Sequence, residues 1–180
     1  MSQKIQSRIG LGLIALVFSV TLAGRPARAA VDAACKLVLD AVAKQLDTPS
    51  HVYMTEVRGG KRETKESVYA GGVIYIQVKG KWRRSPMSKQ DVLKQEEENK
   101  RDAKESCRYL RDEAVNGEAA AVYHAQAENG GVKSDSTFWI SKRTGLPLRN
   151  EEDIDTGDND KWHMSIRYDY AGVQAPAGVK

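Results

Sequence analysis

Residues 138–149 read Phe-Trp-Ile-Ser-Lys-Arg-Thr-Gly-Leu-Pro-Leu-Arg, and this stretch does most to decide the fold. Residues 136–141 combine aromatic and β-branched side chains in a short run, which is typical of a β-strand. Thr144-Gly145 predicts a turn after it, because glycine adopts the left-handed backbone conformation without steric cost. Residues 146–149 then resume an apolar segment. The stretch therefore predicts two antiparallel strands joined by a turn.

A second hairpin is predicted upstream of this stretch. Asn116-Gly117 is the strongest short hairpin signal in the chain, because both residues tolerate the positive φ of a tight turn. Segments with strand character flank it at residues 107–115 and 118–126. Alternating segments separated by turn residues predict the remaining strands at 51–57, 64–70, 73–78, 81–84 and 163–170.

Two helices of different character are also predicted. Residues 33–46 place Cys35, Val38 and Val42 at a spacing of three to four, which aligns them on one face of a helix. Residues 88–106 favour a helix but are mostly charged and have few apolar side chains, so little of that helix can be buried. This second helix is either a solvated flap or a mobile lid.

The fold class follows from this order of elements. One helix, four strands, the charged helix and five more strands are expected in a single domain over residues 30–170, with a flexible tail at 171–180. A chain with only 7% aromatic residues has few large side chains to cover both faces of a nine-stranded antiparallel sheet. We therefore expect the sheet to curve around the helices. The sequence therefore predicts an α+β protein with a curved antiparallel sheet, covered by the N-terminal helix and the charged middle helix.

The N-terminal segment has the three parts of a secretory signal peptide. Lys4 and Arg8 precede an apolar run at residues 9–23, and Ala27-Arg28-Ala29 carries small residues at the two positions that a signal peptidase recognises. We expect residues 1–29 to be removed by cleavage between Ala29 and Ala30, and the mature protein to lie in the periplasm. Retention of the segment as an anchor is the alternative. No other stretch approaches membrane-spanning length.

The net charge of +4 comes from the signal segment. Four of the 28 Lys and Arg residues precede the cleavage site and no Asp or Glu does, so 24 basic residues remain against 24 acidic ones. A neutral mature chain lacks the general attraction to phosphate on which most nucleic-acid-binding proteins depend. We expect no nucleic-acid partner.

Cys35 and Cys107 are the only cysteines in the chain. A disulfide between them can persist outside the reducing cytosol and would stabilise the protein by about 4 kcal/mol in the chain-entropy account. Two buried free thiols are the alternative.

The chain lacks the motifs of known catalytic centres. It contains no Gly-x-Ser-x-Gly, no His-Glu-x-x-His and no phosphate-binding glycine loop. Asp112 and Glu113 are adjacent on a strand and therefore point to opposite faces, so they cannot share a proton. His51, His124 and His163 lie on three separate predicted strands. We expect a protein that is not an enzyme and has no cofactor.

No metal site is expected either. The two cysteines and three histidines lack the spacing of a zinc site. Residues 151–160 are rich in acidic side chains, but Gly157 stands where a calcium loop would need its third ligand. We interpret this segment as a hairpin loop kept soluble by charge.

Three motifs together resemble a known fold superfamily. The first is residues 67–76, Ser-Val-Tyr-Ala-Gly-Gly-Val-Ile-Tyr-Ile, followed by Gly80-Lys81-Trp82 and Ser85-Pro86. The others are Asn116-Gly117-Glu118-Ala119 and the stretch at 138–149. They resemble the periplasmic LolA-like superfamily, which includes the outer-membrane lipoprotein-sorting proteins and the sensor domains of the RseB/MucB type. The resemblance implies an open half-barrel covered by helices, with an apolar concave face able to hold acyl chains.

The apolar strand positions are the candidates for such a face. They either form a core against the first helix or leave part of the face open as a pocket. The candidate ligand-binding residues are Val52, Met54, Ile74, Ile76, Trp82, Tyr109, Phe138, Ile140, Leu146, Leu148, Ile166 and Tyr168.

Two functions are consistent with this sequence. The first is a periplasmic, non-enzymatic binding protein for a lipid, a lipoprotein acyl group or a similar amphiphile. The alternative is a structural or regulatory envelope protein that binds another protein through its sheet edge or its charged helix, without a small ligand.

Overall fold

The computed structural model describes residues 33–100, 103–157 and 160–179. The predicted signal peptide and its cleavage site, Ala29-Ala30, lie outside these residues. The described elements are α1 (Ala33–Asp47), β1 (Ser50–Arg58), β2 (Lys61–Ala70), β3 (Val73–Val78), β4 (Lys81–Arg84), α2 (Lys89–Lys100), β5 (Lys104–Val115), β6 (Glu118–Asn129), β7 (Val132–Ser141), β8 (Pro147–Asp155) and β9 (Lys161–Asp169).

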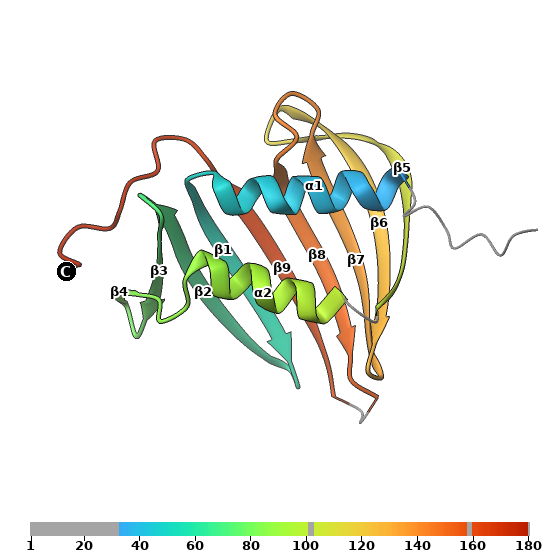
Figure 1. Cartoon of the computed structure of the whole chain (residues 1–180), viewed down its shortest axis with the longest axis horizontal. Helices are drawn as coiled ribbons and strands as arrows, with labels where there is room; N and C mark the ends of the chain where they lie inside the picture. The colour runs from blue at the N-terminus through green and yellow to red at the C-terminus, as the bar shows by residue number, and fades with distance from the viewer. Residues whose placement is uncertain (1–32, 101–102, 158–159, 180) are drawn as a thin grey trace, which may run out of the picture.

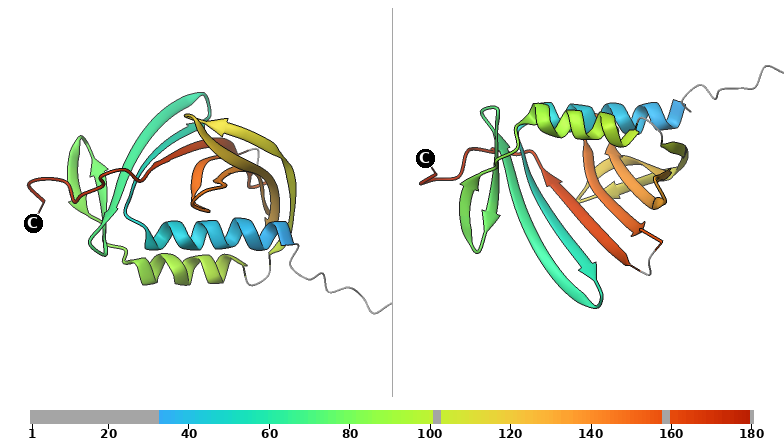
Figure 2. Two further views of the ribbon diagram at one scale, coloured as in Figure 1. Left: turned by 90° about the horizontal axis from the view of Figure 1, so that it is seen from above. Right: turned by 60° about the horizontal axis from the view of Figure 1, so that its bottom comes forward.

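The nine strands form one antiparallel sheet in the order β4-β3-β2-β1-β9-β8-β7-β6-β5. Within β1–β4 and within β5–β9, strands that follow each other in sequence pair as hairpins, and β1 pairs with β9 to join the two halves. The sheet is strongly curved, and both helices lie on its concave side (Figures 1 and 2). The predicted order of elements and the α+β open half-barrel are confirmed.

The turns explain why neighbouring strands pair in this register. Asn116 and Gly117 have φ values of 51° and 84°, so both adopt the left-handed conformation that a two-residue hairpin turn requires. Val115 consequently pairs with Glu118, and β5 and β6 run together for their full length. An L side chain at position 117 would be strained in this conformation.

The helix α1 packs across β5, β6, β7 and β8. Val38 and Ala41 are buried against Ile140, with Tyr123 and Phe138 beside them. At the other end of the helix, Lys44 Nζ donates to the carbonyl oxygen of Thr144 at 2.5 Å. The apolar face predicted for this helix therefore contacts the sheet.

The helix α2 connects the two opposite edges of the sheet, from β4 to β5. It begins where Ser88 and Asp91 cap each other: the Ser88 backbone N–H donates to Asp91 Oδ2 at 2.8 Å, and the Asp91 N–H donates to Ser88 Oγ at 3.2 Å. It lies beside α1 (Figure 2). Of the side chains described in it, none is buried, which agrees with its charged sequence.

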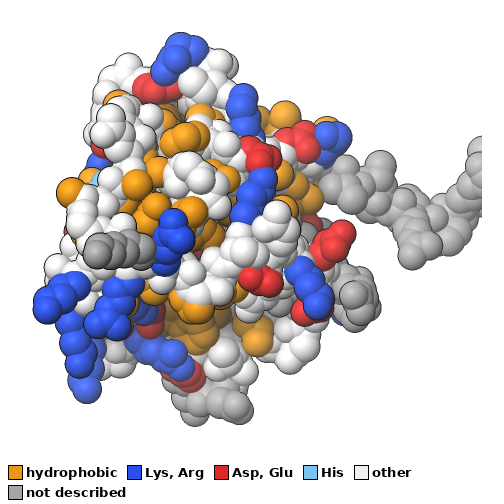
Figure 3. All heavy atoms as spheres, turned by 60° about the vertical axis from the view of Figure 1, so that its left-hand side comes forward, with side chains coloured by type: hydrophobic (Ala, Val, Ile, Leu, Met, Phe, Trp, Pro, Cys, Tyr) orange, Lys and Arg blue, Asp and Glu red, His pale blue; other side chains and the backbone are white. Residues whose placement is uncertain are grey.

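The convex side carries two further apolar clusters. One contains Val68, Ala70 and Tyr75, with Trp82 packed against it, and it also receives Val173 and Val179 of the predicted flexible tail. The other contains Ala120, Val122 and Trp139, together with Val115 and Leu148. Figure 3 views the β3–β4 end, where hydrophobic side chains gather between Lys and Arg side chains.

The structure corrects two predicted boundaries. Residues 151–155 of the acidic segment are strand rather than loop, because β8 extends to Asp155. Its acidic side chains are compensated across the sheet, for example by the ion pair of Lys161 Nζ with Asp155 at 2.7 Å. The charged helix ends at Lys100 instead of 106, because β5 begins at Lys104. Among the described residues, no helix has the length and apolar character needed to cross a membrane.

Candidate functional site

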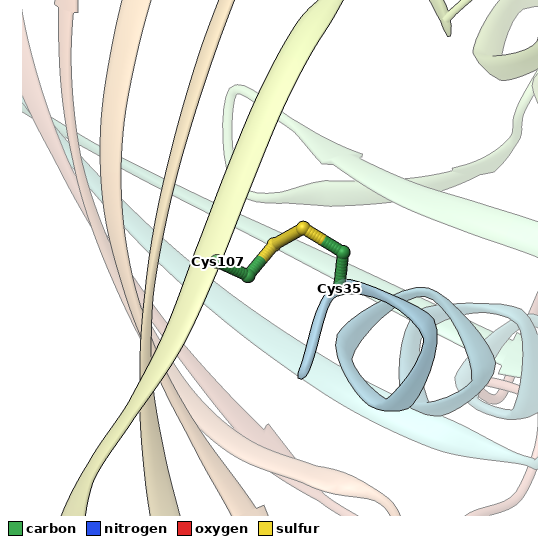
Figure 4. The surroundings of a disulfide bond; sticks show 2 residues. All are labelled: Cys35 and Cys107. Atoms are coloured by element: carbon green, nitrogen blue, oxygen red, sulfur yellow. A yellow bond between two sulfur atoms is a disulfide. The ribbon is translucent and has the colours of Figure 1, made fainter. Parts of the chain in front are cut away.

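The concave space is bounded by α1, which a disulfide ties to the edge strand. Cys35 near the start of α1 is bonded to Cys107 of β5, with a Cα–Cα distance of 4.9 Å (Figure 4). The bond joins residues 72 positions apart in the sequence. The predicted disulfide is confirmed.

The strand register shows which side chains face α1. Residues opposite each other on neighbouring strands point to the same face of a sheet. Phe138, which packs against the α1 cluster, is opposite Asn150, and Asn150 is opposite Ile166. Ile166 is in turn opposite Met54. This row of four side chains crosses the concave face from β7 to β1.

Nine of the twelve predicted face residues lie on the concave side by this register. Tyr109 is among them, although it is at the sheet edge, where its ring makes an edge contact with Tyr123. The full set is Val52, Met54, Ile74, Ile76, Tyr109, Phe138, Ile140, Ile166 and Tyr168.

Three predicted face residues lie elsewhere. Trp82 is opposite Gln77 and packs into the convex cluster around Tyr75. The side chains of β4 alternate between the two faces one residue out of step with the prediction, which moves Trp82 to the convex side. A bulge between Trp139 and Ile140 shifts the register against β8, and Leu148 consequently joins the convex cluster around Trp139. Leu146 is buried in the turn before β8, where its carbonyl oxygen accepts from the Ser141 N–H at 2.9 Å.

A cavity of about 290 Å³ lies between α1 and the sheet. Its apolar wall is formed by Val38, Leu39 and Val42 of α1, facing Ala125 of β6 and Phe138 of β7. The helix therefore covers the concave face without filling it. The side chains of Ala125 and its neighbours across the sheet are too small to close the gap.

A second cavity of about 880 Å³ adjoins the first towards the β1–β2 and β8–β9 turns. The two share four lining residues, Glu105, Gln126, Ala127 and Ser134. Ile154 and Trp162 line its apolar part, and charged side chains of the strand ends surround them. The larger cavity is within the range of small-molecule sites, which is about 300–1,000 Å³, and the smaller one is close to its lower limit.

Polar groups are also present in the smaller cavity. Asn150, Glu152 and Tyr168 line it, and Asn150 is only 5% exposed. Burial raises the pKa of the Tyr168 hydroxyl, and the nearby charge of Glu152 raises it further. The hydroxyl therefore stays protonated at neutral pH. Asn150 and Glu152 were not among the predicted site residues, because polar residues on a strand are normally solvent-facing.

Asp112 and Glu113 point to opposite faces of β5, as expected for neighbours on a strand. Lys142 Nζ donates to Asp112 and lowers the pKa of that carboxyl, whereas Glu113 pairs with Arg111 at 2.7 Å. Asp112 is opposite Ala121 on the concave side and Glu113 is opposite Ala120 on the convex side. The two carboxylates therefore do not form an acid–base pair.

The three histidines each pair with carboxylates of neighbouring strands. His51 is 3.0 Å from Glu66, and His124 is 2.8 Å from Asp135. The hydrogen bond to Asp153 raises the pKa of His163. Within the part of the chain that the structure describes, no three His, Cys, Asp or Glu side chains are grouped closely enough to hold a metal ion.

Comparisons with known proteins identify similar folds only among solved structures. No protein-family model and no curated protein matches the chain. The crystal structure of MucB is 13% identical with a TM-score of 0.45, and the match covers 81% of this chain but 63% of MucB, less than two thirds of its length. LprF from Mycobacterium bovis is 10% identical with a TM-score of 0.44, over 78% of this chain and 94% of LprF. A DUF1329 family protein from Desulfovibrio piger is 14% identical with a TM-score of 0.32, over 81% and 95%. MucB has also been crystallised in complex with MucA(peri), and that structure matches with a TM-score of 0.43.

Proposed function

We propose that this chain is an exported, non-enzymatic binding protein that holds the hydrocarbon part of a lipid, a lipoprotein acyl group or a similar amphiphile on its concave face. The observation that carries the proposal is the cavity between α1 and the sheet, about 290 Å³ in volume and continuous in its lining with the larger one of about 880 Å³. Its apolar walls provide the surface that an alkyl chain would bury.

The periplasm is the compartment we propose. The disulfide between Cys35 and Cys107 is of a kind that persists in oxidising compartments. The charged, apolar and small-residue segments before Ala30 supply the export signal.

The alternative is recognition of another envelope protein without a small ligand. Its support is two exposed apolar side chains, Met87 two residues before α2 and Leu93 within α2, each 40% exposed. Deleting α2 cannot test this alternative, because the helix spans from one edge of the sheet to the other and the two edges would have to be joined without it. Substitutions inside the cavity separate the two functions more cleanly.

Ala125→Trp should abolish most ligand binding by filling the cavity. The indole would occupy the space between β6 and α1 that an alkyl chain needs. We expect the affinity for N-phenylnaphthylamine, an uncharged apolar fluorophore, to fall at least about tenfold, which corresponds to about 1.4 kcal/mol. Fluorescence titration of the mature protein measures this.

Arg108→Trp is the matched control. Arg108 is next to Cys107 on β5 and is opposite His124, so it points to the convex side. The same indole placed there should leave the affinity unchanged. Equal affinities of the wild type and Ala125→Trp, with both proteins folded by circular dichroism, would contradict the proposed function.

A further inference from the structure

Positive charge is concentrated at the β4 edge of the sheet. Residues 67–90, which contain β3, β4 and the start of α2, hold five of the 24 Lys and Arg residues that follow the cleavage site and none of the 24 Asp and Glu residues. The rest of the mature chain has 19 basic residues against 24 acidic ones, a net charge of −5. The mature chain is therefore neutral as a whole but strongly polarised.

Four basic side chains at this edge are exposed and form no ion pair with another residue in the described part of the chain. They are Lys79, Lys81, Arg83 and Arg84, which lie in β4 and in the turn before it and are called the β4 patch below. On β2, Glu66 lies 3.0 Å from His51 and points to the convex side, opposite Tyr53. Lys81 and Arg83 point to the concave side, opposite Val78 and Ile76. The positive charge of the β4 patch is thus left to face solvent.

Apolar side chains lie among these charges. Trp82, between Lys81 and Arg83 in the sequence, is half-buried at the margin of its convex cluster. Met87, which is 40% exposed, follows Arg84 by three residues. Figure 3 shows hydrophobic side chains between Lys and Arg side chains at this end of the molecule. Basic residues attract anionic lipid head groups, and tryptophan favours the layer between head groups and hydrocarbon. The combination fits a membrane surface better than a soluble polyanion, which has no apolar layer.

We propose that the β4 patch docks the protein on an anionic phospholipid surface. The four basic side chains contact head-group phosphates, and Met87 enters the layer beneath them. The inference goes beyond the proposed function, because the membrane is bound by the outer edge of the sheet and the amphiphile by the cavity under α1. The net charge of −5 on the rest of the chain is repelled by the same surface, so the protein binds edge-on, with β4 towards the membrane.

Co-sedimentation of the whole mature protein with lipid vesicles tests the docking. Vesicles of phosphatidylcholine mixed with phosphatidylglycerol present the anionic surface, and vesicles of phosphatidylcholine alone are the uncharged reference. We expect at least about tenfold stronger binding to the mixed vesicles. Added salt should weaken this binding, because it screens exposed charges.

Lys81→Gln/Arg83→Gln tests the β4 patch itself. It removes two of the four charges from exposed positions, so the affinity for mixed vesicles should fall at least about tenfold. Lys142→Gln/Arg143→Gln is the matched control, because it also removes one lysine and one arginine. These two follow β7, on the other half of the sheet, and pair with Asp112 and Glu118. The control should leave the affinity nearly unchanged.

The outcomes are separable from those for the proposed function. Equal binding to charged and uncharged vesicles, or equal losses in the two double variants, would overturn the inference. The β4 charges would then only keep the sheet edge from pairing with other strands. The affinity for N-phenylnaphthylamine reports on the cavity alone, and Lys81→Gln/Arg83→Gln should match the wild type in that titration. Failure of docking with this affinity intact would therefore leave the proposed function standing.

Discussion

Replacing Cys35 and Cys107 with serine should lower the free energy of unfolding by about 4 kcal/mol. The bond spans 72 residues, so it restricts the unfolded chain strongly, and it holds the start of α1 on the edge strand β5. Urea denaturation of Cys35→Ser/Cys107→Ser beside the wild type measures the loss. Both sulfur atoms belong to residues that line the smaller cavity, so ligand binding should weaken in the same variant.

Reduction of the wild type provides an independent control for the disulfide. Dithiothreitol should reproduce the midpoint shift of the double variant and should not shift the double variant itself. A loss below about 1 kcal/mol in both experiments would contradict the role given to the bond, because α1 would then be held by packing alone.

Val38→Asp should lower the free energy of unfolding by about 3 kcal/mol or more. Val38 is 4% exposed and packs against Ile140 beneath α1, so an ionised carboxylate there would be buried without a partner. The disulfide would keep the N-terminal end of α1 attached while the rest of the helix detaches from the sheet. Urea denaturation gives the size of the effect.

Leu37→Asp is the control for this change. Leu37 is the preceding residue of α1 and is 52% exposed, so the same substitution there should change the free energy of unfolding by no more than about 0.5 kcal/mol. Similar losses for the two variants would contradict the orientation of α1 described above.

The overall fold was predictable because its signals are local. The Asn116-Gly117 turn defines its hairpin by backbone conformation alone, and the apolar spacing of Val38 identifies the buried face of α1. The order of strands along the chain is also their hairpin pairing order on each side of the β1–β9 junction.

The side of the sheet to which each side chain points was less predictable, because it depends on bulges that only the strand pairing reveals. The bulge at Trp139/Ile140 moves Leu148 to the convex side, although the alternation of its own strand suggests otherwise. The acidic residues after position 150 resemble a loop by composition. They form a strand because partners on β9, such as Lys161 and His163, compensate their charge.

The cavity itself could not be predicted from periodicity. It exists because Ala125 and Ala127 present small side chains under α1. In the apolar alternation of a strand, alanine is indistinguishable from a residue that fills the core. The burial of Asn150 could not be predicted either, since a polar residue in a strand gives no indication that it is buried.

Native mass spectrometry of the mature protein, purified from the periplasm without detergent, tests the central claim most directly. We predict a stoichiometric additional mass that is lost on extraction into organic solvent and is absent from Ala125→Trp. A bare polypeptide mass for the wild type, unchanged after incubation with envelope lipids, would contradict the claim that the space between α1 and the sheet is a binding site.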